Sequence, residues 1–562
     1  MPKLVVDGKE IEFKQGQTII EAAKEAGNTI PHFCWHPSLS VSGNCRVCLV
    51  EVEKMPKLVI ACSTLAAEGM IVHTASEKAL AARNAVMEFL LINHPLDCPI
   101  CDEAGECKLQ DYAYAHGVGE SRFVEEKTHK DKRVPLGPNI MFDGDRCISC
   151  SRCIRFCDEI AGAPELTFVK RGDRVTIVTY PGRQLENPYA MNVVDICPVG
   201  ALTNRDFRFK ARVWDMSANK TICQGCSRGC NIELWVRNNE ILRITPRQND
   251  EVNSYWMCDH GRLNTFKFVN ADDRVDGPYL RREGSLAKVG WDEAFAAAAS
   301  ELKQFNKNEI AFIGSAFASC EDNYMLREFA LNVIGSRHID FMRHSDSNFG
   351  DEILRKNDIT PNTMGAELVG VTPAAGGLNF DGIINSINEG KIKALYLIED
   401  DILSANPELE NTLAKLNLFI VHSSNFNKTT TLADIVFPAA AYAEKNGTMV
   451  NFQGRIQRLM PAVATLEQDR SLDGMAMSRL DKFGTRFDRW AKGNKRDVRP
   501  TWKIILSLSA AAGYKLIRQA QANMAEDIFE IMSKKIDAFK GLDYDKIGEK
   551  GIMLKIDVAE KA

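Results

Sequence analysis

Several familiar signatures are missing from this sequence of 562 residues. It has no GxGxxG dinucleotide fingerprint and no GxxxxGK[ST] phosphate-binding loop, so nothing indicates a nucleotide site. No run of eighteen apolar residues occurs, so we expect no membrane-spanning helix, and a net charge of −5 gives no reason to expect nucleic-acid binding. The opening MPKLVVDGKEIEF lacks the basic and apolar regions of a secretory signal. The length and the 45% apolar content predict a globular protein of several domains.

Cysteine is the residue that stands out. Fifteen of the 17 cysteines fall into four groups with the spacing of iron–sulfur ligand sets, and only Cys157 and Cys320 lie outside them. Repeated Cys-x2-Cys pairs in so long a chain favour metal binding in a reducing, cytoplasmic setting over disulfides. The pattern predicts a chain that stores and passes single electrons. The groups are Cys34, Cys45, Cys48 and Cys62; His94, Cys98, Cys101 and Cys107; Cys147, Cys150, Cys153 and Cys197; and Cys223, Cys226, Cys230 and Cys258.

The residues before the first group predict a ferredoxin-type β-grasp domain. Asp7-Gly8 lies between two alternating apolar runs and predicts a two-residue hairpin. Thr18 and Glu21 form a capping-box pattern that opens a helix, which we expect to end at Gly27. A hairpin followed by a helix is how such a domain begins.

The first group itself has an unusually long gap, Cys34-x10-Cys45. Plant-type ferredoxins use Cys-x4-Cys-x2-Cys, whereas the longer gap resembles the N-terminal 2Fe–2S domain of respiratory complex I and of iron hydrogenases. Gly43 and Asn44 suit a tight loop whose N–H groups point at sulfur, and Arg46 adds positive charge nearby. A four-cysteine zinc site is the alternative, although zinc favours two close cysteine pairs.

The second group follows a predicted helix over residues 74–93. Thr74 and Glu77 suggest a capping box, and the helix delivers His94 four residues before Cys98-x2-Cys101-x5-Cys107. A neutral imidazole in place of one thiolate removes a negative charge and, taken alone, raises the reduction potential. One histidine with three cysteines resembles the electron-entry chains of complex I and hydrogenases.

The third group is half of a two-cluster ferredoxin pattern. CISCSRCIRFC is followed by CPVGA, but the second run has decayed, because Asn187, Ala190 and Val193 occupy its cysteine positions. One 4Fe–4S cluster remains possible, with Cys197 as its fourth ligand. Cys157 then has no cluster to join, and we interpret it as a small buried apolar residue, as we do Cys320.

The fourth group resembles the small 4Fe–4S domain that opens the molybdopterin oxidoreductase family, with zinc as the alternative. Strands are expected on either side of an Asn238-Asn239 turn, and later in EIAFIGSAF and KALYLIED, which are typical of buried parallel strands. The segment from Ala433, ADIVFPAAAYAEKNGTMVNFQGRIQR, resembles a cofactor-proximal segment of that family. The region is shorter than in full-length enzymes, and FMRHSDSN offers only Ser345 or Asp346 to a metal, so we expect a catalytically dead scaffold without molybdopterin.

Taken together, the ligand sets resemble the large peripheral-arm iron–sulfur subunits of bacterial complex I, the NADH–quinone oxidoreductase. The single surviving 4Fe–4S run agrees with those subunits and departs from iron hydrogenases. The resemblance implies an electron wire without a substrate site of its own, which carries electrons from a flavin-bearing NADH-oxidising subunit toward a ferredoxin-like 4Fe–4S subunit and quinone. It also implies a peripheral place on the cytoplasmic face of the bacterial inner membrane, one 2Fe–2S cluster and two to three 4Fe–4S clusters.

The expected fold is multidomain, α+β and α/β. Its parts are a 2Fe–2S ferredoxin-type domain (1–78), a histidine-ligated 4Fe–4S domain (79–120), a ferredoxin-like 4Fe–4S domain (138–215), a molybdopterin-oxidoreductase-type 4Fe–4S domain (216–273), a truncated molybdopterin-oxidoreductase-like domain (274–462) and a helical C-terminal extension (463–562). Residues such as AEDIFEIMSKKIDAFK in the last part predict a solvated amphipathic helix.

Two other functions fit parts of the pattern. A subunit of a soluble NAD-linked formate dehydrogenase or hydrogenase would share much of the front half, and bound molybdenum or tungsten would favour it. A zinc-bearing scaffold without a redox role would contain zinc in place of iron and would be colourless.

Overall fold

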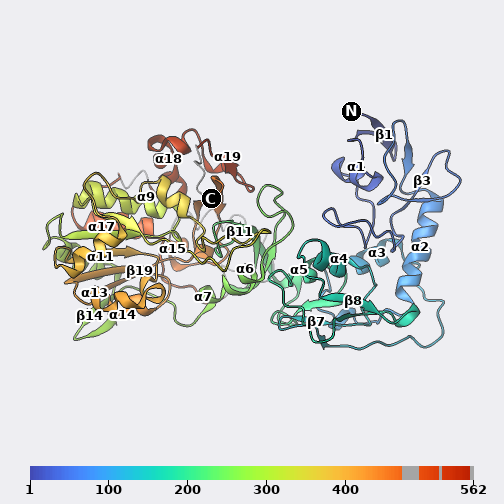
Figure 1. The fold of residues 1–562 in the computed structure, drawn as a ribbon, viewed down its shortest axis with the longest axis horizontal. Helices are drawn as coiled ribbons and strands as arrows, with labels where there is room; N and C mark the ends of the chain where they lie inside the picture. The colour runs from blue at the N-terminus through green and yellow to red at the C-terminus, as the bar shows by residue number, and fades with distance from the viewer. Residues whose placement is uncertain (471–492, 518–521, 557–562) are drawn as a thin grey trace. The chain divides into compact units, whose positions relative to one another are not determined.

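The structure is a computed structural model that describes residues 1–470, 493–517 and 522–556 (Figure 1). The chain forms two compact units, Met1–Trp214 and Asp215–Ala562. Each unit has its own hydrophobic core, as independently folded bodies do.

The first unit opens with a five-stranded sheet in the order β2-β1-β5-β3-β4. The Asp7-Gly8 hairpin is confirmed, and both residues have the positive φ angles (48° and 81°) that a type I′ turn requires. β1 also pairs in parallel with β5. The strands are β1 Lys3–Val6, β2 Lys9–Glu12, β3 Leu49–Val52, β4 Val59–Ile60 and β5 Ile71–His73.

Helix α1 (Ile19–Glu25) packs its apolar residues into the core of this sheet. The predicted capping pair is confirmed, since the backbone N–H of Thr18 donates to Glu21 Oε2 at 2.8 Å. Gly27 follows the helix with a φ of 81°, as expected of a residue that ends it.

The helix expected over residues 74–93 is shorter, because α2 spans Glu77–Leu91. Ser76 is its N-cap and accepts from the N–H of Ala79 at 3.3 Å, so the Thr74 and Glu77 capping box was wrong. Thr74 is engaged elsewhere: its N–H and hydroxyl donate to the Asp7 carboxylate at 2.7 and 2.5 Å. Thr74 therefore bonds to a partner 67 residues away in the sequence and does not cap the helix.

The rest of the first unit consists of short elements that carry the second and third cysteine groups. A three-stranded sheet has the order β10-β7-β6, and β8 pairs with β9 in a hairpin. The elements are β6 Val134–Pro135, β7 Ile140–Phe142, β8 Leu166–Val169, β9 Thr176–Thr179, β10 Leu202–Asn204, α3 Lys108–His116, α4 Arg152–Glu159 and α5 Asn192–Ile196.

The second unit begins with the sheet β11-β12-β13, made of β11 Ser217–Ile222, β12 Asn231–Arg237 and β13 Glu240–Pro246. The predicted turn at Asn238 and Asn239 is confirmed, with φ angles of 52° and 64°. A seven-stranded sheet follows in the order β15-β14-β20-β19-β18-β16-β17. Its strands are β14 Tyr279–Arg282, β15 Ser285–Lys288, β16 Ile310–Gly314, β17 Ile339–Phe341, β18 Ala394–Ile398, β19 Leu418–Ser423 and β20 Ile435–Pro438.

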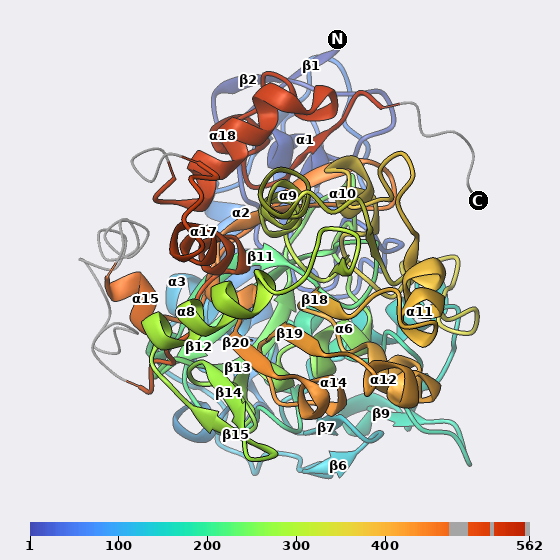
Figure 2. The ribbon, with the colours of Figure 1, turned by 90° about the vertical axis from the view of Figure 1, so that its left-hand side faces the viewer.

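Helices cover both faces of the large sheet (Figure 2). The two strands expected in EIAFIGSAF and KALYLIED are β16 and β18, which are fully buried and pair in parallel. α8, α9 and α17 pack in the core on one face, and α11 to α13 in the core on the other. The helices of the unit are α6 Asp259–Asn264, α7 Lys267–Asn270, α8 Trp291–Leu302, α9 Cys320–Glu328, α10 Thr363–Leu368, α11 Phe380–Asn388, α12 Ile402–Ala405, α13 Glu410–Leu413, α14 Lys428–Leu432, α15 Leu466–Asp469, α17 Thr501–Ala511, α18 Ala525–Lys535 and α19 Tyr544–Ile547.

The described part of the tail belongs to this second unit. α17 and α18 bury Trp502, Ile505 and Phe529 in the core that contains α8 and α9. The chain then adds β23 (Ile552–Met553) to a sheet with β21 (Gly447–Val450) and β22 (Arg455–Leu459). The helix expected in AEDIFEIMSKK is confirmed as α18, while part of the expected extension, residues 471–492, 518–521 and 557–562, lies outside the described residues. No helix in the described part of the chain is long and apolar enough to cross a bilayer.

Candidate iron–sulfur ligand sites

The first cysteine group is brought together by the loop after α1 and by β3 and β4. The Cys34 thiol lies within hydrogen-bonding distance of those of Cys45 and Cys62, and Cys48 contacts Cys62. These contacts lower the pKa values of Cys34, to about 2, and of Cys48, and they raise the pKa values of Cys45 and Cys62, so the thiolate form is favoured at the first two positions. The N–H of Asn44 donates to the Cys34 thiolate, as the tight loop predicts.

The second group lies between the end of α2 and the start of α3. Burial is the main cause that lowers the pKa of His94 to about 4, which keeps the imidazole neutral, the form that binds metals. Cys101 and Cys107 are buried and Cys98 is exposed. Cys101 interacts electrostatically with Cys98 and with Arg146, and the same arginine acts on His94. Cys107 also interacts with Cys101, so Cys101 links the other two thiols, and it shares the neighbour Arg146 with the imidazole.

The third group lines one small pocket. Cys147, Cys150, Cys153 and Cys197 all contribute to its wall, although the last lies in a separate segment of the chain. Cys157 is fully buried and is not among the lining residues; burial raises its pKa to about 12, which keeps it a neutral thiol. This placement agrees with its interpretation as a small apolar residue.

The CPVG segment connects the second and third groups. A Cβ atom at Gly200 would collide with the Cys101 sulfur, so only glycine allows this approach. The Pro198 carbonyl accepts from the N–H of Lys108 at 3.2 Å and lies 3.9 Å from the Cys107 sulfur. Two ligand sets that are separate in the sequence are thus packed against one another.

The fourth group is buried in the second unit. Cys223 follows β11, Cys230 precedes β12, and Cys258 caps α6. The N–H groups of Gly225 and Gly261 donate to the sulfurs of Cys223 and Cys258, each at 3.4 Å. A Cβ at Gly261 would lie 2.8 Å from the Cys223 sulfur, so this glycine is required for the approach.

The donor chemistry of the four sets fits iron–sulfur clusters, in which the thiolates are shared among several irons. N–H donors to sulfur and glycines at the closest approach are features of cluster sites.

Three charged residues with structural roles were not predicted from the sequence. Arg152 and Arg155 on α4 lie between the first and third sets and are visible in the sequence only as the arginines of SRCIRFC. Lys445 is buried in the second unit and donates to Asp322 at 2.7 Å and to Glu399 at 2.6 Å. An isolated basic residue in a sequence is most often solvated, so local pattern gave no signal for any of them.

Ser345 and Asp346, the two oxygen donors considered for molybdenum, are both exposed. Ser345 makes a bridge with Asp358, and the Asp346 carboxylate accepts from the N–H of Asn348 at 2.9 Å. These local bonds account for their conformation as parts of a surface loop.

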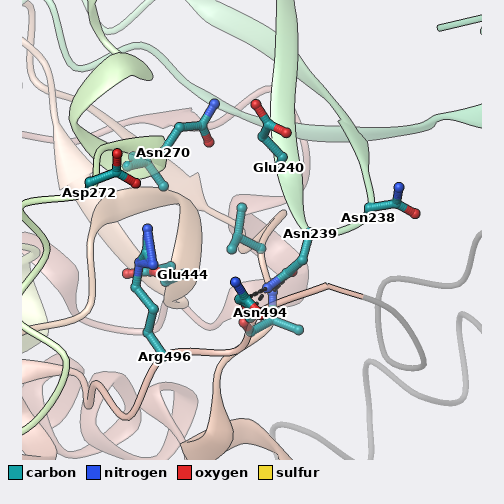
Figure 3. A pocket seen from close by; sticks show the side chains of 11 residues that line it. Asn238, Asn239, Glu240, Asn270, Asp272, Glu444, Asn494 and Arg496 are labelled. Carbon is teal, nitrogen blue, oxygen red and sulfur yellow. Dashed lines mark hydrogen bonds between the residues drawn. The ribbon is translucent and has the colours of Figure 1, made fainter.

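The second unit also contains a polar pocket of about 230 Å³ that no thiol lines (Figure 3). Its polar groups hold the protein together: Asn239 bonds to Ala464 and to the Asn494 carbonyl, and Glu444 is paired with Arg274 at 2.6 Å. Arg496 donates to the Ala271 carbonyl at 3.0 Å. These bonds therefore fix the β12–β13 turn against later segments of the chain.

Family models match most of the chain. They are a 2Fe–2S iron–sulfur cluster binding domain (residues 3–77), an NADH-ubiquinone oxidoreductase-G iron–sulfur binding region (83–122), an NADH-quinone oxidoreductase subunit 3 ferredoxin-like domain (137–203), a molybdopterin oxidoreductase Fe4S4 domain (216–270) and molybdopterin oxidoreductase (274–369 and 362–472).

Curated relatives carry related names. The G subunit of NADH-quinone oxidoreductase from Rickettsia bellii is 43% identical over 336 residues, which cover 59% of this chain and 48% of the relative. The mitochondrial NADH-ubiquinone oxidoreductase 78 kDa subunit of Neurospora crassa is 41% identical over 60% of this chain and 45% of its own length. The NADH-ubiquinone oxidoreductase 75 kDa subunit of Reclinomonas americana is 38% identical over 64% of this chain and 53% of its own length. The chain thus matches about half the length of these relatives.

A crystal structure of NAD⁺-reducing [NiFe]-hydrogenase in the H2-reduced state is 32% identical over 38% of this chain and 91% of that chain. Its TM-score of 0.35 is too low to support a conclusion about the fold.

Proposed function

Because this chain is homologous to the G subunit of NADH-quinone oxidoreductase, we propose that it is an iron–sulfur electron-transfer subunit of a complex I. It takes electrons from a flavin-bearing NADH-oxidising subunit and delivers them toward a ferredoxin-like 4Fe–4S subunit and quinone. The complex is an NADH:quinone oxidoreductase and translocase, and this chain lies peripherally on the cytoplasmic face of the bacterial inner membrane.

The ligands in this proposal are the four sets described above. The first holds a 2Fe–2S cluster in a β-grasp domain, and the His94 and Cys147 sets hold 4Fe–4S clusters; the Cys223 set holds a further 4Fe–4S cluster. Bound iron–sulfur clusters supply reversible one-electron storage at these positions. The protein's own contribution is N–H donors to sulfur and the nearby Arg152, which stabilise the anionic ligand sets, whereas burial alone disfavours thiolates.

The observation that carries the proposal is the third set, where four thiols from two distant segments line one pocket while the neighbouring Cys157 is left out. We further propose that the molybdopterin-oxidoreductase-like region acts as a scaffold without molybdopterin; its two candidate oxygen donors, Ser345 and Asp346, are exposed loop residues.

The test is anaerobic counting of iron and acid-labile sulfide, with EPR of the reduced protein. We expect about ten irons per chain, or about fourteen with the fourth set filled, and both 2Fe–2S and 4Fe–4S signals. A sample without labile sulfide would contradict the proposal. Stoichiometric molybdenum or tungsten would instead favour a formate dehydrogenase, and zinc in place of iron a structural scaffold.

A further inference from the structure

The long gap between Cys34 and Cys45 packs against the third ligand set. Four of the ten residues in this gap, Trp35, Ser40, Ser42 and Asn44, make side-chain or backbone bonds to the loop after Cys147 or to α4, all within the first unit. The extra residues that distinguish this gap from the plant-type spacing are thus used to attach one ligand set to another. Three of the bonds are Asn44 Nδ2 to the Ser149 carbonyl at 3.1 Å, Ser151 Oγ to Ser42 Oγ at 3.3 Å, and Ser40 N to Glu159 Oε2 at 2.8 Å.

Arg152 joins the same two ligand segments in the protein interior. Its side chain is 4% exposed, and its two terminal nitrogens donate in different directions. Nη2 donates to the carbonyl of Trp35, next to Cys34, at 2.5 Å, and Nη1 donates to the carbonyl of Ile196, next to Cys197, at 3.1 Å. One planar guanidinium therefore spans the backbone beside a ligand of each set.

Arg155 makes a second bridge one turn further along α4. Its Nη2 donates to the Cys34 carbonyl at 2.5 Å and also faces the Cys150 carbonyl at 3.5 Å, and its Nη1 donates to the Ser40 carbonyl. Because Arg155 is only partly buried, water screens its charge more than that of Arg152.

The charge of Arg152 is compensated by the ligand sets themselves. None of the ion pairs formed by the described residues includes Arg152, and burying a cation without an anionic partner is costly. The acidic groups that act on it are the thiols of Cys150, Cys197, Cys34 and Cys45, which belong to both sets. A cation so placed favours additional negative charge on either set.

We propose that Arg152 is a positioning residue shared by two electron-carrying sites. It holds the first and third ligand sets against each other, and its buried charge raises the reduction potential at both. This inference rests on the proposed function, because it requires that both sets hold redox clusters.

The test compares the full chain with the variants R152Q and R152K by anaerobic redox titration followed by EPR. R152Q removes the charge, so we expect both centres to become harder to reduce, with at least a tenfold change in the oxidised-to-reduced ratio at a fixed potential, or ~59 mV. R152K keeps the charge and should shift both centres by less than half as much. Unchanged potentials in R152Q, or a shift of one centre alone, would overturn the inference.

Arg83 supplies the matched control. It is also buried, at 3% exposure, and donates to backbone carbonyls, but the thiol that acts on it is Cys48 of the first set. R83Q should therefore shift the first centre and leave the third unchanged. A parallel shift of both centres in R83Q would show that the joint response is not specific to Arg152.

If R152Q loses its clusters, the iron content of R152K decides the test. Iron present at both sets in R152K supports a cation shared by the two sets, and iron missing from either set in R152K overturns the inference. Failure of the proposed function is distinguishable, because in that case the unmodified chain itself contains no labile sulfide.

Discussion

Cys153 and Cys157 are one turn apart on α4, both thiols are buried, and both have a raised pKa because burial disfavours the thiolate. What separates them is the pocket: Cys153 lines it together with three other thiols, and Cys157 does not. Burial and a raised pKa therefore do not identify a ligand, whereas shared space with other donors does.

The variant C157A should leave the iron content unchanged, because this thiol is outside the ligand pocket. Removing one buried sulfur should cost about 1 kcal/mol of stability. The matched variant C153A, on the same helix, should lose about four irons per chain. Iron analysis of both variants, prepared anaerobically, is the measurement; a loss of iron in C157A as large as that in C153A would show that the decayed ferredoxin pattern was misassigned.

Replacing His94 tests the second set at its one nitrogen donor. H94C exchanges a neutral imidazole for a thiolate, so the site gains a negative charge and its potential should fall by ~59 mV or more. The measurement is a redox titration with EPR detection. H73C, which changes a histidine paired with Glu53 on the surface, should leave the potential unaltered. An equal potential in H94C and the unmodified chain would count against His94 as a ligand.

At the residue scale, the sequence predicts which thiols line the pocket of the third group, but it does not predict their charged neighbours. Cysteine spacing is a local pattern, and it predicted the four thiols of the third group that line one pocket. Arg152 bonds to Trp35, 117 residues earlier, and Lys445 bonds to Asp322, 123 residues earlier. Only the fold brings such partners together, so no local pattern contains them.

At the scale of elements, turns were predictable because they depend on their own residues. The Asp7-Gly8 and Asn238-Asn239 turns formed as expected, since these residue types tolerate positive φ. The start of α2 was not predictable in this way, because Asp7 from the first turn binds Thr74, and Ser76 caps the helix instead. Local propensity fails where a distant partner competes for the same side chain.

Glu321 on the first turn of α9 ties together three elements. Its carboxylate accepts from the N–H and hydroxyl of Thr448 on β21, at 2.8 and 2.9 Å, and from the Tyr544 hydroxyl on α19 at 3.1 Å. Burial is the main cause that raises its pKa to about 7, although the bonds from Thr448 oppose the shift. The folded state therefore binds a proton here at pH values at which the unfolded chain has released it.

This raised pKa predicts a pH dependence of stability. A carboxyl whose pKa is higher in the folded state loses stability as the pH rises from its unfolded value, near 4.5, through 7. The loss is on the order of 1–3 kcal/mol. E321Q removes the titration, so the melting temperature of the unmodified chain relative to E321Q should fall between about pH 5 and pH 8. A difference that is constant over this range would contradict the assignment; E530Q, at an exposed carboxyl on α18, serves as the control.

At the scale of the whole molecule, the described structure forms two compact units, and the described residues of the expected C-terminal extension contribute to the second. After residue 492, Trp502, Phe529 and Tyr544 lie in the same core as α8 and α9. Amphipathic spacing in a lysine-rich tail predicted the helix α18, but periodicity alone does not reveal which surface receives its apolar face.

Separate expression of the second unit tests this organisation. The fragment 215–562 contains the complete core of the unit and the Cys223 set, so it should fold, unfold in a cooperative thermal transition and retain about four irons. The fragment 215–462 lacks α17, α18 and β23, which would expose the apolar surface that they cover on the core around α9 and the large sheet. It should therefore aggregate or melt without cooperativity, because the side chains that fill that core are missing.

Circular dichroism melting curves of the two fragments, with C223A in the longer one as a control for iron content, provide the comparison. Equal melting temperatures for the two fragments would show that the tail is an appendage and not part of the core.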